Sequence, residues 1–294
     1  MYRLAGLCAG YAYLLKKPLS KVSRRPHAVV TPLRRRWNIS RRDLIRDRGL
    51  REGAEDGKSV VLVPSTEIAV AAAGPTMPIA RKAMQSKDHW ETVYATKPPT
   101  EVSWYQSAPT LSLDLIRKLD LPADATIADI GGGASTLVDH LLSLGLHRLV
   151  VVDLAGHALA AARDRLGARA AGVRWIVGDV TTPVLPEASA DLWHDRAVFH
   201  FLTASEDRAA YVAQARRAVR PGGHLIIATF ALDGPTQCSG LPVVRYDVAG
   251  LRAEFAPAFD LVAHTTETHT TPAGHAQSFL YCHFVPHPSA LMPD

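Results

Sequence analysis

The junction at residues 127–133 constrains the fold of this chain more than any other feature. It reads Ile-Ala-Asp-Ile-Gly-Gly-Gly, an apolar strand that stops at Asp129 and opens into a glycine turn before a predicted helix over 135–143. Gly131 and Gly133 have no Cβ, so the backbone can approach a ligand closely, and the N–H groups at the start of the following helix are free to bind it. The junction therefore predicts an α/β domain that holds a nucleotide-like cofactor at this turn.

Further short apolar runs follow the turn, and acidic residues close several of them. The runs are 148–152 before Asp153, 173–177 before Gly178-Asp179-Val180, 191–194 before Asp195-Arg196, and a last one that follows Arg-Pro-Gly-Gly at 220–223. The carboxyl ends of parallel strands meet at one edge of a sheet, so these acids should converge. Asp153 could then accept both hydroxyls of a ribose, and Asp179 could reach the exocyclic amine of an adenine.

This succession of strands and acids resembles the class I S-adenosylmethionine-dependent methyltransferases over about residues 88–284. The resemblance implies a doubly wound, Rossmann-like α/β fold with a seven-stranded sheet and a reversed last strand. It also implies S-adenosylmethionine as the cofactor and methyl transfer as the reaction. The third glycine of the family turn is Ser135 here, a residue that can cap a helix. Residues 259–264 and 277–284 match the last two strands, joined by a polar loop over 265–276.

The resemblance also assigns cofactor contacts to particular positions. The implied cofactor-binding residues are Tyr94, Trp104, Asp129, Gly131, Gly133, Asp153, Leu154, Asp179, Val180, Asp195 and Arg196. The aromatic segment before the first strand is similar to that of small bacterial methyltransferases and of elongation-factor lysine methyltransferases. It implies a lid of Tyr94, Trp104 and Tyr105 over the cofactor, whose cationic sulfonium suits an aromatic face. Ordinary core packing is the alternative for these side chains.

Methyl transfer places few demands on side-chain chemistry, because the sulfonium already activates the methyl group and the protein mainly aligns the reacting atoms. His200 is the candidate general base, with a buried, hydrogen-bonded histidine as the alternative. Tyr246 is a candidate for orienting the acceptor, or else it packs beside Asp247, the expected N-cap of a helix. No metal site is expected, because Cys8, Cys238 and Cys282 and the C-terminal histidines lack metal-ligand spacing.

Charge divides the chain into two parts. Residues 1–83 carry 17 Lys and Arg against 6 Asp and Glu, whereas residues 84–294 carry 16 against 22. We therefore expect a basic, poorly ordered extension over 1–83 and a methyltransferase domain over 84–294, with a nucleic-acid substrate unlikely. No transmembrane helix is predicted, and the expected location is the cytoplasm, or a mitochondrion or other organelle if the basic start is a transit peptide.

These motifs do not identify the methyl acceptor. An amine, a hydroxyl or a thiol remains open, on a small molecule or on a protein lysine. Two alternatives to a methyltransferase also remain open. The first is an NAD-dependent oxidoreductase, whose fingerprint requires glycine where Thr136 stands and an acid nearer the turn than Asp153. The second is a non-catalytic S-adenosylmethionine-binding subunit that regulates a partner.

Overall fold

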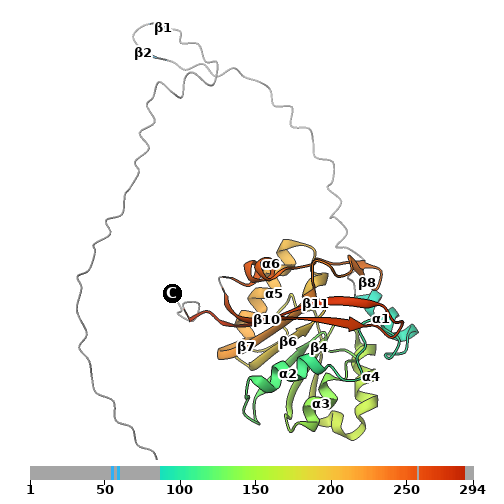
Figure 1. Cartoon of the computed structure of the whole chain (residues 1–294). Helices are drawn as coiled ribbons and strands as arrows, with labels where there is room; N and C mark the ends of the chain where they lie inside the picture. Colours follow the sequence, from blue (N-terminus) through green and yellow to red (C-terminus); the bar gives the residue numbers. More distant parts are fainter. Residues whose placement is uncertain (1–53, 56–57, 60–86, 257, 289–294) are drawn as a thin grey trace, which may run out of the picture. The chain divides into compact units, whose positions relative to one another are not determined.

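A computed structural model describes residues 54–55, 58–59, 87–256 and 258–288 (Figure 1). The chain divides into two units, Met1–Ala72 and Ala73–Asp294. In the first unit the described residues form two short antiparallel strands, β1 (Ala54–Glu55) and β2 (Lys58–Ser59). The predicted boundary between residues 83 and 84 lies outside the described residues.

The second unit contains a seven-stranded sheet in the order β10-β11-β7-β6-β3-β4-β5. The strands are β3 (Thr126–Ile130), β4 (Arg148–Asp153), β5 (Val173–Val177), β6 (Ala190–Arg196), β7 (Val219–Phe230), β10 (Phe259–Thr270) and β11 (Ala276–Pro286). Five of them, from β7 to β5, pair in parallel. Strand β11 runs antiparallel to both β7 and β10, which confirms the predicted seven-stranded sheet with a reversed last strand. A parallel nicotinamide-type sheet lacks this reversal, so the topology disfavours that alternative.

The last two strands are longer than predicted. Strands β10 and β11 pair from Phe259 with Pro286 to Thr270 with Ala276, so the connecting loop shrinks to residues 271–275. The sequence pattern underestimated the length of β10, because an edge strand with little buried surface carries polar residues and shows no apolar alternation. His269 accordingly lies within β10, not in a surface loop, and only 4% of it is exposed.

Helices cover both faces of this sheet (Figure 1). The helices are α1 (Lys87–Thr96), α2 (Thr110–Lys118), α3 (Leu137–Ser143), α4 (Gly156–Leu166), α5 (Ser205–Ala218) and α6 (Val248–Phe255), with 3₁₀ turns η2 (Gly167–Gly172) and η3 (Phe199–Phe201). Apolar side chains of α2, α3 and α4 pack on one face of the sheet, and those of α5 and α6 pack on the other. The central parallel strands are therefore buried on both faces, as β3 and β4 show.

Helices α6 and α5 begin in different ways. The Asp247 side chain accepts a hydrogen bond from the Gly250 N–H at 2.7 Å, which confirms it as the N-cap of α6. Helix α5 begins at Ser205 itself after Ala204, and this start has no side-chain cap. Within the described part of the chain, no helix combines the length and the apolar character needed to cross a membrane.

Candidate functional site

The carboxyl ends of β3, β4, β5 and β6 open into one cavity of ≈ 1140 Å³. We call the ends of β3, β4 and β5 together with the glycine turn the floor. The roof consists of α1, the segment 97–109 and the hairpin of β8 (Gln237–Cys238) and β9 (Leu241–Pro242). Eight of the eleven predicted cofactor-binding residues line this cavity, namely Tyr94, Trp104, Gly131, Asp153, Leu154, Asp179, Val180 and Arg196.

The glycine turn leaves room that no other residue type would leave. Gly131 and Gly133 have φ values of 63° and 41°, in the left-handed region. A Cβ on Gly133 would lie 2.7 Å from an oxygen of Asp153, and a Cβ on Gly131 would collide with Val198. The Gly131 N–H donates to the Val152 carbonyl at 2.7 Å, which fixes the turn against β4. The turn thus offers bare backbone at the floor of the cavity.

Two acids lie along the floor beyond the turn. Asp153 accepts a hydrogen bond from the Ala155 N–H at 2.8 Å, and burial raises the pKa of its carboxyl to about 7, with Asp129 and Glu91 adding to the rise. Asp179 is exposed and accepts from the backbone and hydroxyl of Thr181. A desolvated carboxylate with few donors is suited to receive the hydroxyl groups of a ligand.

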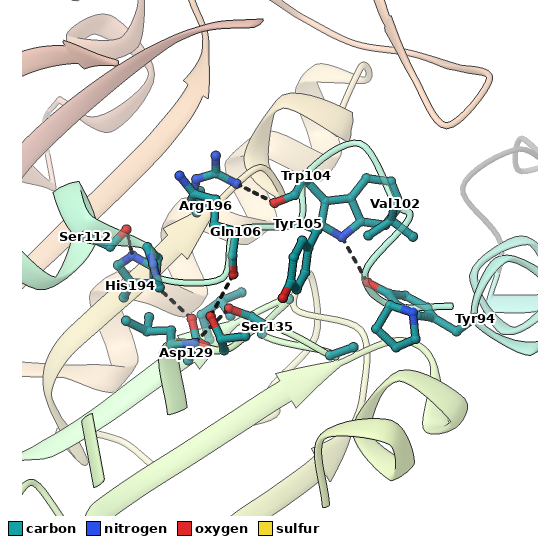
Figure 2. Close-up of a pocket in the computed structure, with 18 residues that line it drawn as sticks. Tyr94, Val102, Trp104, Tyr105, Gln106, Ser112, Asp129, Ser135, His194 and Arg196 are labelled. Atoms are coloured by element: carbon teal, nitrogen blue, oxygen red, sulfur yellow. Dashed lines mark hydrogen bonds and ion pairs between the residues drawn. The ribbon is translucent and has the colours of Figure 1, made fainter. Parts of the chain in front are cut away.

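Asp129 belongs to a second, small cavity of ≈ 50 Å³ beside the glycine turn (Figure 2). His194 on β6 contacts Asp129, with 2.9 Å between Nδ1 of His194 and Oδ1 of Asp129. The Nε2 atom of His194 lies 3.0 Å from the Ser112 hydroxyl of α2. All three residues are buried. The second oxygen of Asp129, Oδ2, is buried and has no hydrogen-bond partner. The sequence indicated Asp129 but neither His194 nor Ser112.

Aromatic side chains dominate the roof. Trp104 lies 5.8 Å from Trp90 and 6.2 Å from Tyr94, measured between ring centroids, and Trp90 lies 5.1 Å from Phe201 of η3. The indole N–H of Trp104 donates to the Tyr94 hydroxyl at 3.3 Å (Figure 2). The structure therefore brings Tyr94 and Trp104 together above the floor. Trp90 and Phe201 join them, although the predicted lid included neither.

Polar contacts hold the segment 97–109 in place. The Arg196 guanidinium donates to the Trp104 carbonyl at 3.2 Å and to the Tyr281 hydroxyl at 2.9 Å, and Glu267 lies 3.6 Å from it. His269 contacts the Ser103 carbonyl at 2.8 Å. Arg196 thus anchors the roof to β11 and β10, a role that depends on tertiary neighbours and that the motif alone did not reveal.

Helix α1 is anchored by Glu91. Its carboxylate accepts hydrogen bonds from the Gly156 N–H at 2.8 Å and the His157 N–H at 3.0 Å, at the start of α4. Free N–H groups at a helix start favour negative charge, and these donors lower the pKa of Glu91 to about 2. The roof is therefore attached to the helix that follows Asp153.

The side chain of Asp195, a predicted cofactor-binding residue, turns into the protein interior. Its side chain is fully buried and accepts from the N–H groups of Val198 and Phe199, at 2.8 and 3.1 Å, and from the Tyr211 hydroxyl at 2.5 Å. Burial raises the pKa of its carboxyl to about 6. Asp195 lines neither of the two cavities described above. Its carboxylate closes the turn between β6 and η3, because the N–H groups there have no strand partners.

The two candidate catalytic residues also lie outside both cavities. His200 is fully buried, its Nδ1 accepts from the Phe230 N–H at 3.2 Å, and burial lowers its pKa to about 3. Tyr246 is 5% exposed and its ring packs 5.8 Å from that of Phe199. These placements favour the packing alternatives over a general base at His200 or an orienting hydroxyl at Tyr246.

Comparisons with known proteins agree with this geometry. Residues 128–227 match the methyltransferase domain family. Among solved structures, a methyltransferase from Anabaena variabilis that depends on S-adenosylmethionine aligns with a TM-score of 0.55 at 15% identity, over 68% of this chain and 95% of that one. A protein from Pyrococcus horikoshii aligns with a TM-score of 0.53 at 15% identity, over 67% and 99%. No curated protein matches the chain.

A third similar structure was solved in work on the conversion of a disulfide bond into a thioacetal group during echinomycin biosynthesis. It aligns with a TM-score of 0.56 at 19% identity, over 68% of this chain and 91% of that one. At these identities the structural likenesses establish the fold.

Proposed function

We infer that this chain, a class I S-adenosylmethionine-dependent methyltransferase by its domain and its sheet, methylates a small acceptor enclosed beneath the aromatic roof. The observation that carries this proposal is the single cavity in which the glycine turn, Asp153 and the roof aromatics meet. When bound, S-adenosylmethionine supplies a methyl group that its sulfonium has already activated. The residues of the chain then bind, orient and exclude water.

The floor fits this cofactor. In the proposal Asp153 accepts the ribose hydroxyls, and Asp179 with Val180 holds the adenine. The bare backbone at Gly131 and Gly133 receives the methionine part, and the unpaired Oδ2 of Asp129 offers a partner for its ammonium group. An ionised acceptor atom left buried without a donor is costly, so a cationic ligand group nearby would relieve that cost.

The roof favours a small acceptor over a lysine on a folded protein. Trp90, Trp104 and Phe201 enclose the part of the cavity over β6, and the β8–β9 hairpin contributes Cys238 to the same wall. The hairpin reaches α1 through a 3.4 Å contact between Ser239 Oγ and His89 Nε2. A ligand site of this volume exceeds what one cofactor needs. The remaining lining combines aromatic and apolar side chains with the charged residues Lys87, Glu206 and Asp207, which suits a small acceptor with an apolar body and a polar end.

The side chains at the inner wall are poor proton acceptors at neutral pH. Burial raises the pKa of the Cys238 thiol to about 11 and that of the Tyr94 hydroxyl above its usual range. An acceptor that loses its proton without help from these two side chains is therefore favoured. Of the acceptor types left open by the sequence, a thiol meets this condition most readily, because its ordinary pKa of about 8.5 leaves some thiolate at neutral pH.

Calorimetric titration of the full chain with S-adenosylhomocysteine tests the cofactor half of the proposal, with NAD as the control ligand. We expect micromolar binding of S-adenosylhomocysteine and none of NAD. Transfer of a labelled methyl group to a panel of small aromatic thiols, amines and phenols tests the acceptor half, with lysine peptides alongside. Turnover of the peptides without turnover of the small molecules would contradict the enclosed-acceptor proposal.

A further inference from the structure

A buried hydrogen-bonded chain runs from the floor into the protein interior. It links Ser112 on α2, His194 on β6 and Asp129 on β3 through contacts of 3.0 and 2.9 Å (Figure 2). Exposed fractions of 0%, 2% and 5% leave these residues almost no contact with bulk solvent. The Ser112 hydroxyl cannot meet a substrate from this position, so the arrangement is not a nucleophilic triad despite its composition.

The chemistry of the three groups determines the direction of the hydrogen bonds. A carboxylate only accepts, so the Nδ1–H of His194 donates to Oδ1 of Asp129. In a neutral imidazole the other nitrogen is then an acceptor, so the Ser112 hydroxyl donates to Nε2. The contact with Ser112 thereby matches the tautomer that donates to Asp129. The hydrogen bond from His194 engages one carboxylate oxygen of Asp129 and leaves the other without a partner.

The unused oxygen lies beside the glycine turn. A Cβ on Gly132 would come within 2.5 Å of Oδ2, so this oxygen is directed at the turn backbone. Asp129, His194, Ser112 and Gly132 all line the same small cavity of ≈ 50 Å³. That volume accommodates a group of only a few atoms. A partial rotation of the Asp129 carboxylate would turn its free oxygen away from this space.

We propose that His194, with Ser112 behind it, is a positioning residue that fixes the Asp129 carboxylate so that Oδ2 receives the ammonium group at the methionine end of the cofactor. This inference rests on S-adenosylmethionine being the cofactor of the proposed function. His194 itself does not touch the ligand. Its contribution is to hold one oxygen of the carboxylate, which presents the other at the correct angle and prevents the carboxylate from turning into the protein.

Two ligands that differ only at the methionine end test the proposal. S-adenosylhomocysteine carries the ammonium and carboxylate groups, whereas 5′-methylthioadenosine keeps the adenosine and the thioether but lacks both. The full-length wild type and variants are titrated with each ligand. His194→Leu removes both hydrogen bonds. His194→Asn places an amide N–H near the former Nδ1 and retains the donor to Asp129.

We expect His194→Leu to weaken S-adenosylhomocysteine binding by roughly 10- to 100-fold, the usual effect of losing a well-placed charge-assisted hydrogen bond. Binding of methylthioadenosine should change by less than about threefold. His194→Asn should recover most of the lost affinity, and Ser112→Ala should give a smaller, equally ligand-selective loss. An equal loss for both ligands, or no loss for either, would overturn the positioning role.

Two further outcomes are decisive. If His194→Leu fails to fold, His194→Gln decides in its place, because its amide lies near the former Nε2, keeps the contact with Ser112 and loses the donor to Asp129. If the wild type binds neither ligand, the cofactor assignment itself fails. That outcome differs from an unselective loss in the variants, which defeats only the positioning role.

Discussion

The floor and the roof of the cavity are built in opposite ways. Backbone geometry determines the floor. The parallel sheet places both the glycine turn, with its positive φ values, and the acids at the strand ends. In the roof, side chains from distant parts of the chain hold one another, as the contacts of Arg196 and Glu91 show. A floor of this kind suits one invariant ligand, whereas a roof of side chains can be altered without disturbing the sheet.

The floor acid Asp153 should give the largest effect on cofactor binding. We expect Asp153→Asn to weaken S-adenosylhomocysteine binding by roughly 1.5 to 3 kcal/mol, because charge-assisted hydrogen bonds are lost. Calorimetry measures this directly, and Asp164→Asn on the exposed side of α4 is the control. Unchanged affinity in Asp153→Asn would show that the ribose acid lies elsewhere.

The same substitution should stabilise the protein in the absence of cofactor. Burial raises the folded-state pKa of Asp153 to about 7, above the ordinary 3.8, so the folded protein holds this proton more tightly than the unfolded chain. The resulting cost is absent below pH 3.8, grows as the pH rises and is complete above about 7. At pH 8 we expect Asp153→Asn to raise the free energy of unfolding by about 1 kcal/mol, or roughly 2 to 4 °C in Tm. The gain should vanish near pH 4.

The roof aromatic Trp90 should affect the acceptor and not the cofactor. Trp90→Leu removes ring contacts with Trp104 and Phe201, and we expect the KM of the acceptor to rise by up to about tenfold. The affinity for S-adenosylhomocysteine should change little. Trp175→Leu on β5 is the matched control, because that residue lines neither cavity. Equal losses for acceptor and cofactor in Trp90→Leu would place Trp90 in the cofactor site.

Substitution of Glu91, which anchors helix α1 of the roof, should have a smaller effect. Glu91→Gln should lower the free energy of unfolding at pH 7 by at most about 1 kcal/mol, since the residue is partly exposed and acts as a capping carboxylate. Its folded-state pKa is lowered from 4.5 to about 2, so the stabilisation is present above pH 4.5 and is lost as the pH falls to about 2. Denaturant titrations across this range measure the difference. Asp88→Asn, exposed on the same helix, is the matched control.

Cys238 should give the smallest effect. Its thiol is neutral at pH 7, because burial raises the pKa to about 11, so it acts neither as a base nor as a nucleophile. We expect Cys238→Ala to change kcat by less than about twofold and to leave the pH profile of the reaction unchanged. A lost ascending limb in that profile would identify the thiol as a proton acceptor in the roof.

Local patterns in the sequence were sufficient for the floor. The glycine turn at Gly131 and Gly133 and the acid at Asp153 all lie at strand ends, and parallel strands bring their carboxyl ends to one edge whatever the details of packing. Each of these features depends on a few neighbouring residues and on a general rule of α/β topology. The reversed last strand was expected instead from the resemblance of this succession to the methyltransferase family, and the sheet has it.

Tertiary packing decided the rest. Asp195 follows a strand as Asp153 does, yet its carboxylate turns inward to N–H groups of η3 and to Tyr211, a difference that no local pattern encodes. Ser112, His194 and Asp129 come together only because α2 docks on β3 and β6 in one register. Hydrogen bonds between distant residues require positions accurate to a fraction of an ångström, and only the packed core supplies that accuracy.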